Sequence, residues 1–480
     1  MTSRRKWSLL AGVLASVALV RCGSAPPAAP GTPPPPTAPL RTFAGPAEAQ
    51  AALLELEDRR AFDPSILEST ARATDPAVRA RAALALGRIA DPRGRALLVA
   101  LLGDRDPAVE ASAAFGSQIM GDPTITSELI PLLSNRETSV AQAAARAIGF
   151  LGRGDGQDAL TAAVETAASP EPRATILRSL WHFAAPATAQ EALRFASDPD
   201  ARVRFGAIYA IARKPLESSL PSLTAALSDS DADIAAFAAR ALGVLAKKES
   251  AEPLAAALDS GKAPLVTNAL VALEAVLEKN PGTSVGKERI ARVLTLAGDA
   301  NPNVAVPALT LLRQFAGADR DVFRRLWTIA TTGAGYRRQV ALSSATAVLR
   351  DNALPALENA ANSSEVPLRA AAAEALGYLT FAKASALRSK LAADPAPLVR
   401  GAILASLPTA EAVSQNRALV QAVANDSDPG VRAAAIDALT RLSDASVIPL
   451  LSEAISKAAA VRDPDVPLAV IAAAEKLRAE

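Results

Sequence analysis

Three aspartates at alternate positions are the first residues in this 480-residue sequence whose spacing could do chemistry. Asp229, Asp231 and Asp233 resemble the first ligands of a calcium-binding loop. Such a loop needs glycine at its sixth position for a sharp turn and glutamate at its twelfth for bidentate binding. This sequence has Ile234 and Arg240 at those positions. We therefore predict that the aspartates cap the start of a helix and bind no metal.

One histidine and one cysteine limit metal and nucleophilic chemistry further. His182 and Cys22 have no second histidine or cysteine with which to build a zinc site. No residue pattern pairs His182 with a nucleophile, so we predict a helix residue beside Trp181 rather than a catalytic triad. The glycine-rich stretch at 152–156 follows no predicted strand, and we interpret it as a turn rather than a dinucleotide site. We expect no cofactor, no metal and no enzymatic activity.

Short helices must position the remaining candidates, and residues 75–91 give their pattern. In DPAVRARAALALGRIAD, Asp75 can cap the free amides, and the proline after it suits the first helical position. Val78 and Leu86 fall on one apolar face. The pattern returns 31 residues later at Asp106, and again near the other end of the chain. Because a helix this small cannot bury its apolar face alone, it must stack on copies of itself.

The motifs DPxVR and AAxxLG within residues 75–87 resemble the HEAT-like repeats found in bacteria, a kind also seen in phycobilin lyase subunits. The resemblance covers residues 47–480 and implies an all-α fold, an α-solenoid that forms a superhelix of about 13 helix pairs. The first helix is expected at 47–61, and further first helices include 95–103, 127–133, 220–227 and 447–455. The second helices are expected to start near Asp75, Asp106, Thr138, Ser169, Asp198, Asp229, Lys262, Asn301, Gly335, Glu365, Pro395, Asp428 and Asp463. The break at 280–283 is interpreted either as a longer turn or as a hinge between two half-arrays.

A set of arginines follows the starts of the second helices: Arg79, Arg204, Arg369, Arg400 and Arg432. In HEAT-like families such arginines bridge to acids in adjacent repeats. The resemblance therefore implies a structural ladder, with ligand binding as the alternative.

A second set emerges when the repeats are laid over one another. Leu84 and Arg88 are four residues apart and share a face other than that of Val78 and Leu86. In related solenoids the second helices line the concave surface. The candidate binding residues at equivalent positions are Arg88, Phe115, Arg146, Phe150, Arg178, His182, Tyr209, Arg213 and Arg240. They are either scattered surface residues or a groove of rings and guanidinium groups. Such a groove would suit an extended peptide or an acidic segment.

Residues 1–22 have the features of an export signal. Three basic residues are followed by an apolar run of about 14 residues, which is short for a membrane-spanning helix and typical of a signal sequence. The sequence LVRC at 19–22 resembles a bacterial lipobox, in which the cysteine is acylated and becomes the new N-terminus. Arg21 departs from the small residue expected there. We predict lipid attachment at Cys22, with another exported form and a chance match as the alternatives.

A proline-rich linker is predicted at 23–46. Its sequence GSAPPAAPGTPPPPTAPL at 23–40 favours neither helix nor sheet and is typical of an extended spacer. By resemblance to the sorting rule of enteric bacteria, Gly23 after the cysteine favours the outer membrane. We therefore expect an exported protein, anchored by lipid in the bacterial outer membrane on its periplasmic or surface side.

Charge argues against nucleic acid as a partner. The formal net charge is +2, but four basic residues lie within the first 21. Without them the chain has 47 basic and 49 acidic residues, a formal charge of −2. A nearly neutral chain has no general electrostatic attraction to nucleic acid.

The sequence thus predicts a non-enzymatic protein-binding scaffold of the bacterial cell envelope, tethered by lipid. Its expected partners are a protein or extended peptide and, through the N-terminal lipid, a membrane. One alternative is an accessory HEAT array of a prolyl isomerase, although helices are expected to continue to Glu480 and leave no room for that domain. Another alternative is a lyase or glycosylase of the HEAT-like kind, and export argues against a DNA substrate.

Overall fold

The computed structural model describes residues 40–167, 169–183 and 186–442, together with Pro449 and Ile471. Within these ranges every regular element is an α-helix or a short 3-10 helix, and consecutive helices pack on one another. The prediction of an all-α solenoid is thereby confirmed. The predicted signal at 1–22 with Cys22, most of the predicted linker at 23–46 and the predicted helices from 447 onward lie outside the described residues.

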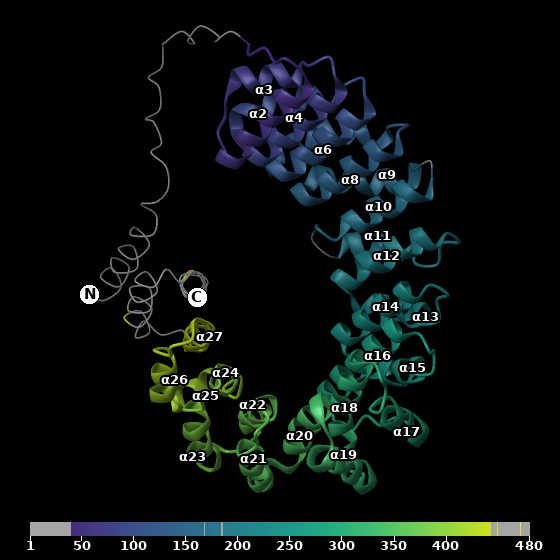
Figure 1. The fold of residues 1–480 in the computed structure, drawn as a ribbon. Coiled ribbons are helices and arrows are strands. Elements are labelled where there is room, and N and C mark those ends of the chain that lie inside the picture. The colour runs from purple at the N-terminus through teal and green to yellow at the C-terminus, as the bar shows by residue number, and fades with distance from the viewer. Residues whose placement is uncertain (1–39, 168, 184–185, 443–448, 450–470, 472–480) are drawn as a thin grey trace, which may run out of the picture. The chain divides into compact units, whose positions relative to one another are not determined.

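The chain divides into two compact units between Arg289 and Ile290. In the N-terminal unit, α2 and the second helices each pack against the next and form one layer (Figure 1). They are α2 (Pro46–Arg59), α4 (Pro76–Ile89), α6 (Pro107–Met120), α8 (Thr138–Leu151), α10 (Pro170–Leu180), α12 (Ala201–Arg213), α14 (Ala232–Leu245) and α16 (Ala263–Lys279).

The first helices of this unit are shorter and form the other layer. They are α3 (Pro64–Ala71), α5 (Arg95–Leu101), α7 (Thr126–Leu129), α9 (Gly154–Thr166), α11 (Ala187–Leu193), α13 (Leu220–Ala226) and α15 (Ala251–Ala257). Short 3-10 helices accompany several of them: η1 (Pro92–Gly94), η2 (Pro123–Ile125), η3 (Ile130–Ser134), η4 (Glu217–Ser219) and η5 (Lys248–Ser250).

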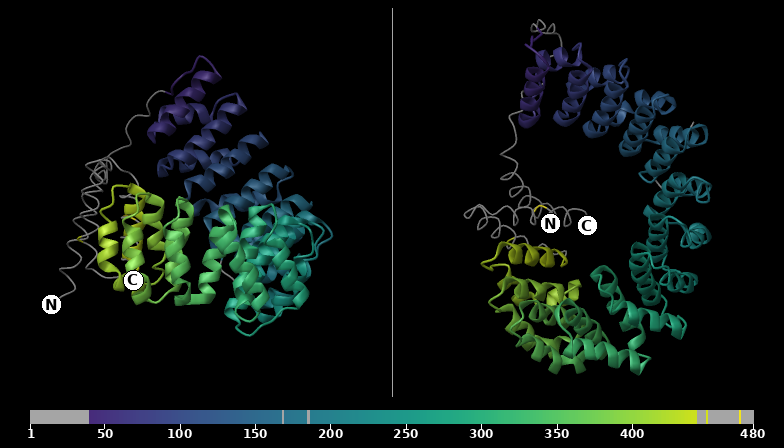
Figure 2. Two further views of the ribbon diagram at one scale, coloured as in Figure 1. Left: turned by 60° about the horizontal axis from the view of Figure 1, so that its bottom comes forward. Right: turned by 45° about the vertical axis from the view of Figure 1, so that its right-hand side comes forward.

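The C-terminal unit repeats this two-layer arrangement (Figure 2). Its second helices are α18 (Pro302–Ala316), α20 (Gly335–Leu349), α22 (Val366–Ala375), α24 (Pro397–Ala405) and α27 (Pro429–Thr440). Its other helices are α19 (Arg320–Thr332), η6 (Arg350–Ala353), α21 (Leu354–Ala361), η7 (Leu376–Tyr378), α23 (Phe381–Ala392), α25 (Ala410–Gln415) and α26 (Arg417–Val423). Helix α17 (Lys287–Leu296) spans the division. No helix in the described ranges has the length and apolar character needed to cross a membrane.

Aspartate caps begin α4 and α6 where the sequence predicted them. The Asp75 carboxylate accepts a hydrogen bond from the Ala77 amide at 2.8 Å, and Asp106 accepts one from Ala108 at 2.9 Å. These bonds satisfy amides that have no partner inside the helix, so each helix starts at a defined residue.

Alanine and glycine let neighbouring second helices approach until their backbones touch. A Cβ atom built on Gly87 would lie 2.5 Å from the carbonyl oxygen of Gly116 on the next second helix. Val78 is 2% exposed and Leu86 is 1% exposed, so the apolar face predicted for α4 is buried. Helices with small contact residues therefore build a core from many close approaches instead of large rings.

The predicted break at 280–283 connects α16 to α17. The Asn280 side chain closes the end of α16, because its amide nitrogen donates to the carbonyl oxygens of Ala246 and Val276, both at 2.8 Å. The division between the two units follows at Arg289 and Ile290.

Candidate functional site

One class of arginine in the array is structural. Arg79 donates from Nε and Nη2 to the two carboxylate oxygens of Asp104, at 2.7 and 2.8 Å. Its Nη1 donates to the carbonyl oxygens of Ala73 and Thr74 in the loop before its own helix. One guanidinium thus ties its own repeat to the loop of the next repeat, with both side chains buried.

The same arrangement recurs along the chain and confirms the predicted ladder. Arg204 pairs with Asp229 at 2.7 Å, Arg369 with Asp394 at 2.7 Å, and Arg400 with Asp426 at 2.6 Å. Arg432 donates to the carbonyl oxygens of Asp426 and Ser427, which is the loop half of the motif.

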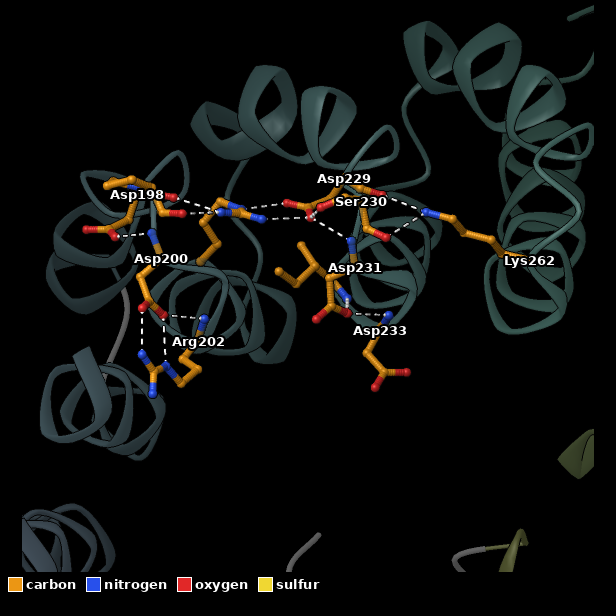
Figure 3. A network of polar contacts seen from close by, with 11 residues as sticks. Asp198, Asp200, Arg202, Asp229, Ser230, Asp231, Asp233 and Lys262 are labelled. Atoms are coloured by element: carbon orange, nitrogen blue, oxygen red, sulfur yellow. Dashed lines mark hydrogen bonds and ion pairs between the residues drawn. The ribbon is translucent and has the colours of Figure 1, made fainter.

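The aspartates that resemble a calcium loop belong to this ladder. Asp229 is the partner of Arg204 and also accepts from the Asp231 amide at 2.9 Å (Figure 3). Asp231 in turn caps α14 by accepting from the Asp233 amide at 2.8 Å. Among the described residues no group of three or more potential ligands could hold a metal ion. The capping interpretation is therefore right for Asp231 alone, because Asp229 is a loop partner of Arg204 and Asp233 lies within the first turn of α14.

Hydrogen bonds from arginine hold the ladder carboxylates ionised. The Arg204 guanidinium lowers the pKa of Asp229, and Arg79 does the same to the pKa of Asp104. Arg202 and its backbone amide lower the pKa of Asp200 to about 2, with the side-chain bond as the largest cause. These carboxylates therefore lack the raised pKa that a general acid would need at neutral pH.

The other class of arginine lies on the exposed face of the second helices. Phe115 is 43% exposed and Phe150 is 54% exposed, and Arg88, Arg146, Arg178, Arg213 and Arg240 are exposed as well. Burial therefore agrees with the register in which these positions face away from the core. Their role in binding stays a prediction.

Rings from successive helices touch one another beside these residues, and most of the rings are half-buried. The His182 ring stacks on Trp181 with centroids 4.0 Å apart, and its edge meets Phe150 of α8 at 6.1 Å. Further along, Tyr209 and Phe205 of α12 both contact Phe237 of α14, at 5.4 and 5.6 Å. Four successive repeats thus contribute rings to one side of the array, where the rings form two separate groups.

Arg213 joins the two ring groups. Its guanidinium carbon lies 5.0 Å from the ring centroids of both Trp181 and Tyr209, within cation–π range. Its Nη2 also donates to the Tyr209 hydroxyl at 2.8 Å. This guanidinium is therefore held in place by neutral groups and by no carboxylate of the described residues.

We call this surface the aromatic–arginine stripe. It consists of Arg146, Phe150, Arg178, Trp181, His182, Phe205, Tyr209, Arg213, Phe237 and Arg240.

The stripe is positively charged and lacks local acids. On α8, α10, α12 and α14 the acids are Glu171 and Asp233, and both lie in the first turn of their helix. Arg178 donates to the neutral Thr175 hydroxyl at 3.0 Å. Desolvation, and then the like charge of Arg178, lowers the pKa of Arg146. Over the part of the chain that the structure describes, no carboxylate pairs with any of the four stripe arginines.

His182 is a neutral ring in this setting. Desolvation is the largest cause that lowers its pKa, followed by the positive charges of Lys214 and Arg213. It lies in the turn just after α10, beside Trp181 as expected, although the helix itself ends at Leu180.

Two predicted residues stand apart from the stripe. The Arg88 guanidinium donates at 2.8 Å to Glu57, a carboxylate that also accepts from Arg81, so Arg88 belongs to an intramolecular ion pair. Phe115 is exposed on α6, and the ring contacts described above begin only at Phe150 on the next second helix.

Three rings of the stripe were missed in the sequence. Phe205 and Phe237 lie one turn from the positions equivalent to Leu84 and Arg88, and Trp181 lies next to one of them, so a comparison of only two positions per repeat does not include these rings. The four-residue spacing of Phe205 and Tyr209 was the available signal, because residues four apart share a helix face.

Comparison with known proteins identifies the repeat. The family model for HEAT repeats matches residues 64–149, 195–275 and 384–478, together more than half of the chain. No curated protein matched the sequence.

Solved structures add a likeness in fold. A Kap95:Nup1 complex is 14% identical with a TM-score of 0.55, over 87% of this chain and 67% of that one. Importin beta is 13% identical with a TM-score of 0.48, over 90% and 77%. The complex of CpcE and CpcF of phycocyanin lyase from Nostoc sp. PCC7120 is 19% identical with a TM-score of 0.32, over 55% and 97%. The paired helices, the arginine–aspartate ladder and the family match agree, and the chain belongs to the HEAT-repeat family.

Proposed function

We propose that this chain is a non-enzymatic protein-binding scaffold of the bacterial cell envelope, tethered by a lipid on Cys22. The aromatic–arginine stripe is its binding surface. The partner is a protein, engaged through an extended segment.

One observation carries this proposal: the stripe combines exposed and half-buried rings with guanidinium groups that no described carboxylate neutralises. Tyrosine, tryptophan and arginine are the residues most often found at the energetic centres of protein interfaces. The ladder arginines serve as the comparison for the stripe arginines. In the same array an aspartate forms an ion pair with each of Arg79, Arg204, Arg369 and Arg400. The stripe arginines therefore differ from the arginines that the fold itself needs.

A protein partner is favoured over other anions by the rings. A charged surface alone would suit any polyanion, but rings of this size contribute mainly through apolar contact area. The fold neighbour Kap95 is itself in complex with a protein, Nup1.

The proposed tether rests on the sequence. A basic start, a short apolar run and Cys22 form the signal, and the proline-rich stretch that follows separates the helices from the lipid. Such a tether would hold the array near one membrane and leave the stripe free to reach a partner.

The test is reversible crosslinking in intact envelopes, followed by affinity capture of the full-length chain. The stripe variant carries Arg146→Gln and Arg213→Gln. The control variant carries Arg153→Gln and Arg202→Gln, which are exposed arginines outside the stripe. Circular dichroism establishes that both variants keep the helical content of the parent.

We expect a discrete envelope protein to be captured by the parent and by the control variant, and lost from the stripe variant. Recovery of the same proteins with all three chains would contradict the proposed binding surface.

A further inference from the structure

We propose that the stripe binds an acidic protein segment in the polyproline II conformation, with a carboxylate at every third residue. This inference rests on the proposed function and deepens it by naming the chemistry and spacing of the partner. Its basis is the placement of one free arginine on each of four consecutive second helices.

One arginine lies on each helix, at equivalent positions except for Arg213, which lies one turn further along α12. Arg146 lies on α8, Arg178 on α10, Arg213 on α12 and Arg240 on α14, and each of these helices packs against the next. A ligand that crosses these helices therefore meets one guanidinium per repeat.

Close helix contacts set the spacing of the series. A Cβ atom on Gly149 of α8 would lie 2.8 Å from the Ser179 carbonyl oxygen of α10. One on Gly206 of α12 would lie 2.6 Å from the Ala174 carbonyl oxygen of α10. Helices that touch in this way have axes about 8 to 10 Å apart.

This spacing selects among ligand conformations. A β-strand repeats its side chains on one face about every 6.6 Å, which is too short. A polyproline II helix has three residues per turn and rises about 3.1 Å per residue, so one face repeats about every 9.3 Å. Ten residues in that conformation span the four arginines. An α-helix matches the spacing only at every seventh residue, so it would need about 22 residues to do the same.

The rings suit the same conformation. Proline-rich segments dock on aromatic surfaces, since their backbone is already ordered and little entropy is lost on binding. Trp181 and Tyr209 flank Arg213 on two sides, so a carboxylate that reaches this guanidinium brings its neighbouring residues against rings.

The charges of the stripe also favour an acidic ligand. The four cations carry no acidic partner on their own helices beyond the first turns, so a carboxylate from a ligand has no internal competitor. Arginine and carboxylate form short, charge-assisted pairs that favour one orientation.

The test compares two peptides of identical composition and charge. One is (Glu-Pro-Pro)4, with carboxylates at every third residue, and the other carries its four glutamates at positions 1, 3, 5 and 7. Fluorescence anisotropy at physiological salt measures the affinity of each for the full-length chain. The variant Arg146→Gln/Arg178→Gln is compared with the control Arg153→Gln/Arg202→Gln.

We expect the three-residue period to bind about fivefold more tightly than its isomer, equivalent to about 1 kcal/mol. This preference disappears in the stripe variant and persists in the control. Equal affinities for the two peptides would overturn the inference, as would tighter binding of an acidic helical peptide with a seven-residue period. Equally tight binding of a 12-residue oligodeoxythymidylate would also overturn it, because the stripe would then recognise only the negative charge of its ligand.

The two proposals fail in different ways. If the stripe variant loses an envelope partner but neither peptide is preferred, the proposed binding surface is supported and the proposed three-residue spacing of the ligand is wrong. If the stripe variant keeps every partner, the proposed binding surface itself is wrong.

Discussion

At the scale of single residues, the array uses arginine in two opposite ways. Ladder arginines such as Arg79 and Arg204 are largely buried, bidentate and neutralised by an aspartate of the next repeat. Stripe arginines are exposed, and among them Arg213 contacts neutral rings and Arg178 donates to a hydroxyl. Residue type alone does not separate these roles, but the contact does. Each bidentate ladder arginine meets an aspartate 25 or 26 residues later, whereas the glutamate 25 residues after Arg146 forms no ion pair with it in the structure.

Removing a ladder carboxylate leaves a guanidinium without its partner. We expect Asp229→Asn to lower the free energy of unfolding by about 2 to 3 kcal/mol. The substitution breaks a largely buried ion pair and leaves the Arg204 guanidinium without its carboxylate. Urea unfolding followed by circular dichroism measures the change. The control is Asp233→Asn in the first turn of α14, which is exposed and should change stability by less than about 0.5 kcal/mol. Equal effects of the two substitutions would show that the ladder contributes nothing specific.

The ladder also predicts a pH dependence with a definite sign. Hydrogen bonds from arginine lower the pKa of Asp104, Asp229, Asp394 and Asp426 in the folded chain. Their contribution is therefore complete above the unfolded pKa of about 3.9 and is lost as the pH falls through the lower folded values. Between pH 5 and pH 3 we expect the urea midpoint to fall, and to fall less steeply in Asp229→Asn. Parallel curves for the two proteins would contradict this linkage.

At the scale of elements, equivalent positions end successive second helices in the left-handed conformation. Gly121 and Gly152 have φ of 72° and 69°, as glycine readily does, while Ala90 has φ of 55° at the matching place. An alanine there pays a steric cost that glycine avoids.

This matched set gives a paired prediction. We expect Gly121→Ala to destabilise by about 1 kcal/mol, and Ala90→Gly to stabilise by a smaller amount, since the same backbone is relieved. Nothing lies within 4 Å of a Cβ built on Gly121, so the effect is conformational and not a clash. Thermal melting of the two variants should shift in opposite directions. Shifts of the same sign would contradict the explanation.

The helices and their order were predictable, because each repeat carries its own start and stop signals. Caps such as Asp75 and Asp106 fix helix starts locally, and the apolar period fixes which face is buried. The site was only partly predictable. The Arg88–Glu57 pair joins different helices, and the ring contacts of Trp181 with Arg213 depend on the side-chain rotamers of two repeats. No pattern within one repeat contains that information.

At the scale of the whole molecule, a repeat array follows a proposed membrane anchor. Each unit buries its apolar faces through nearest-neighbour contacts, so the array itself needs no membrane to complete its core. The anchor is therefore a separate, removable feature of the proposal.

The tether is tested by removing its thiol. We expect Cys22→Ser to move the protein from the membrane fraction to the soluble fraction after cell fractionation, since the acyl group can no longer attach. Urea unfolding of the variant should match that of the parent, which separates loss of the anchor from loss of the fold. Retention in the membrane fraction would show that Cys22 is not the anchor.

The central claim is that the stripe contacts a partner, and site-specific photo-crosslinking in intact envelopes tests it most directly. A photoreactive benzoylphenylalanine replaces Phe150 in the stripe or, in a separate chain, Leu54 on α2, and both native side chains are 54% exposed. We predict a discrete crosslinked protein from position 150 that disappears when Arg146→Gln and Arg213→Gln are added, and none from position 54. The same crosslinked products from both positions, or none from position 150, would contradict the claim.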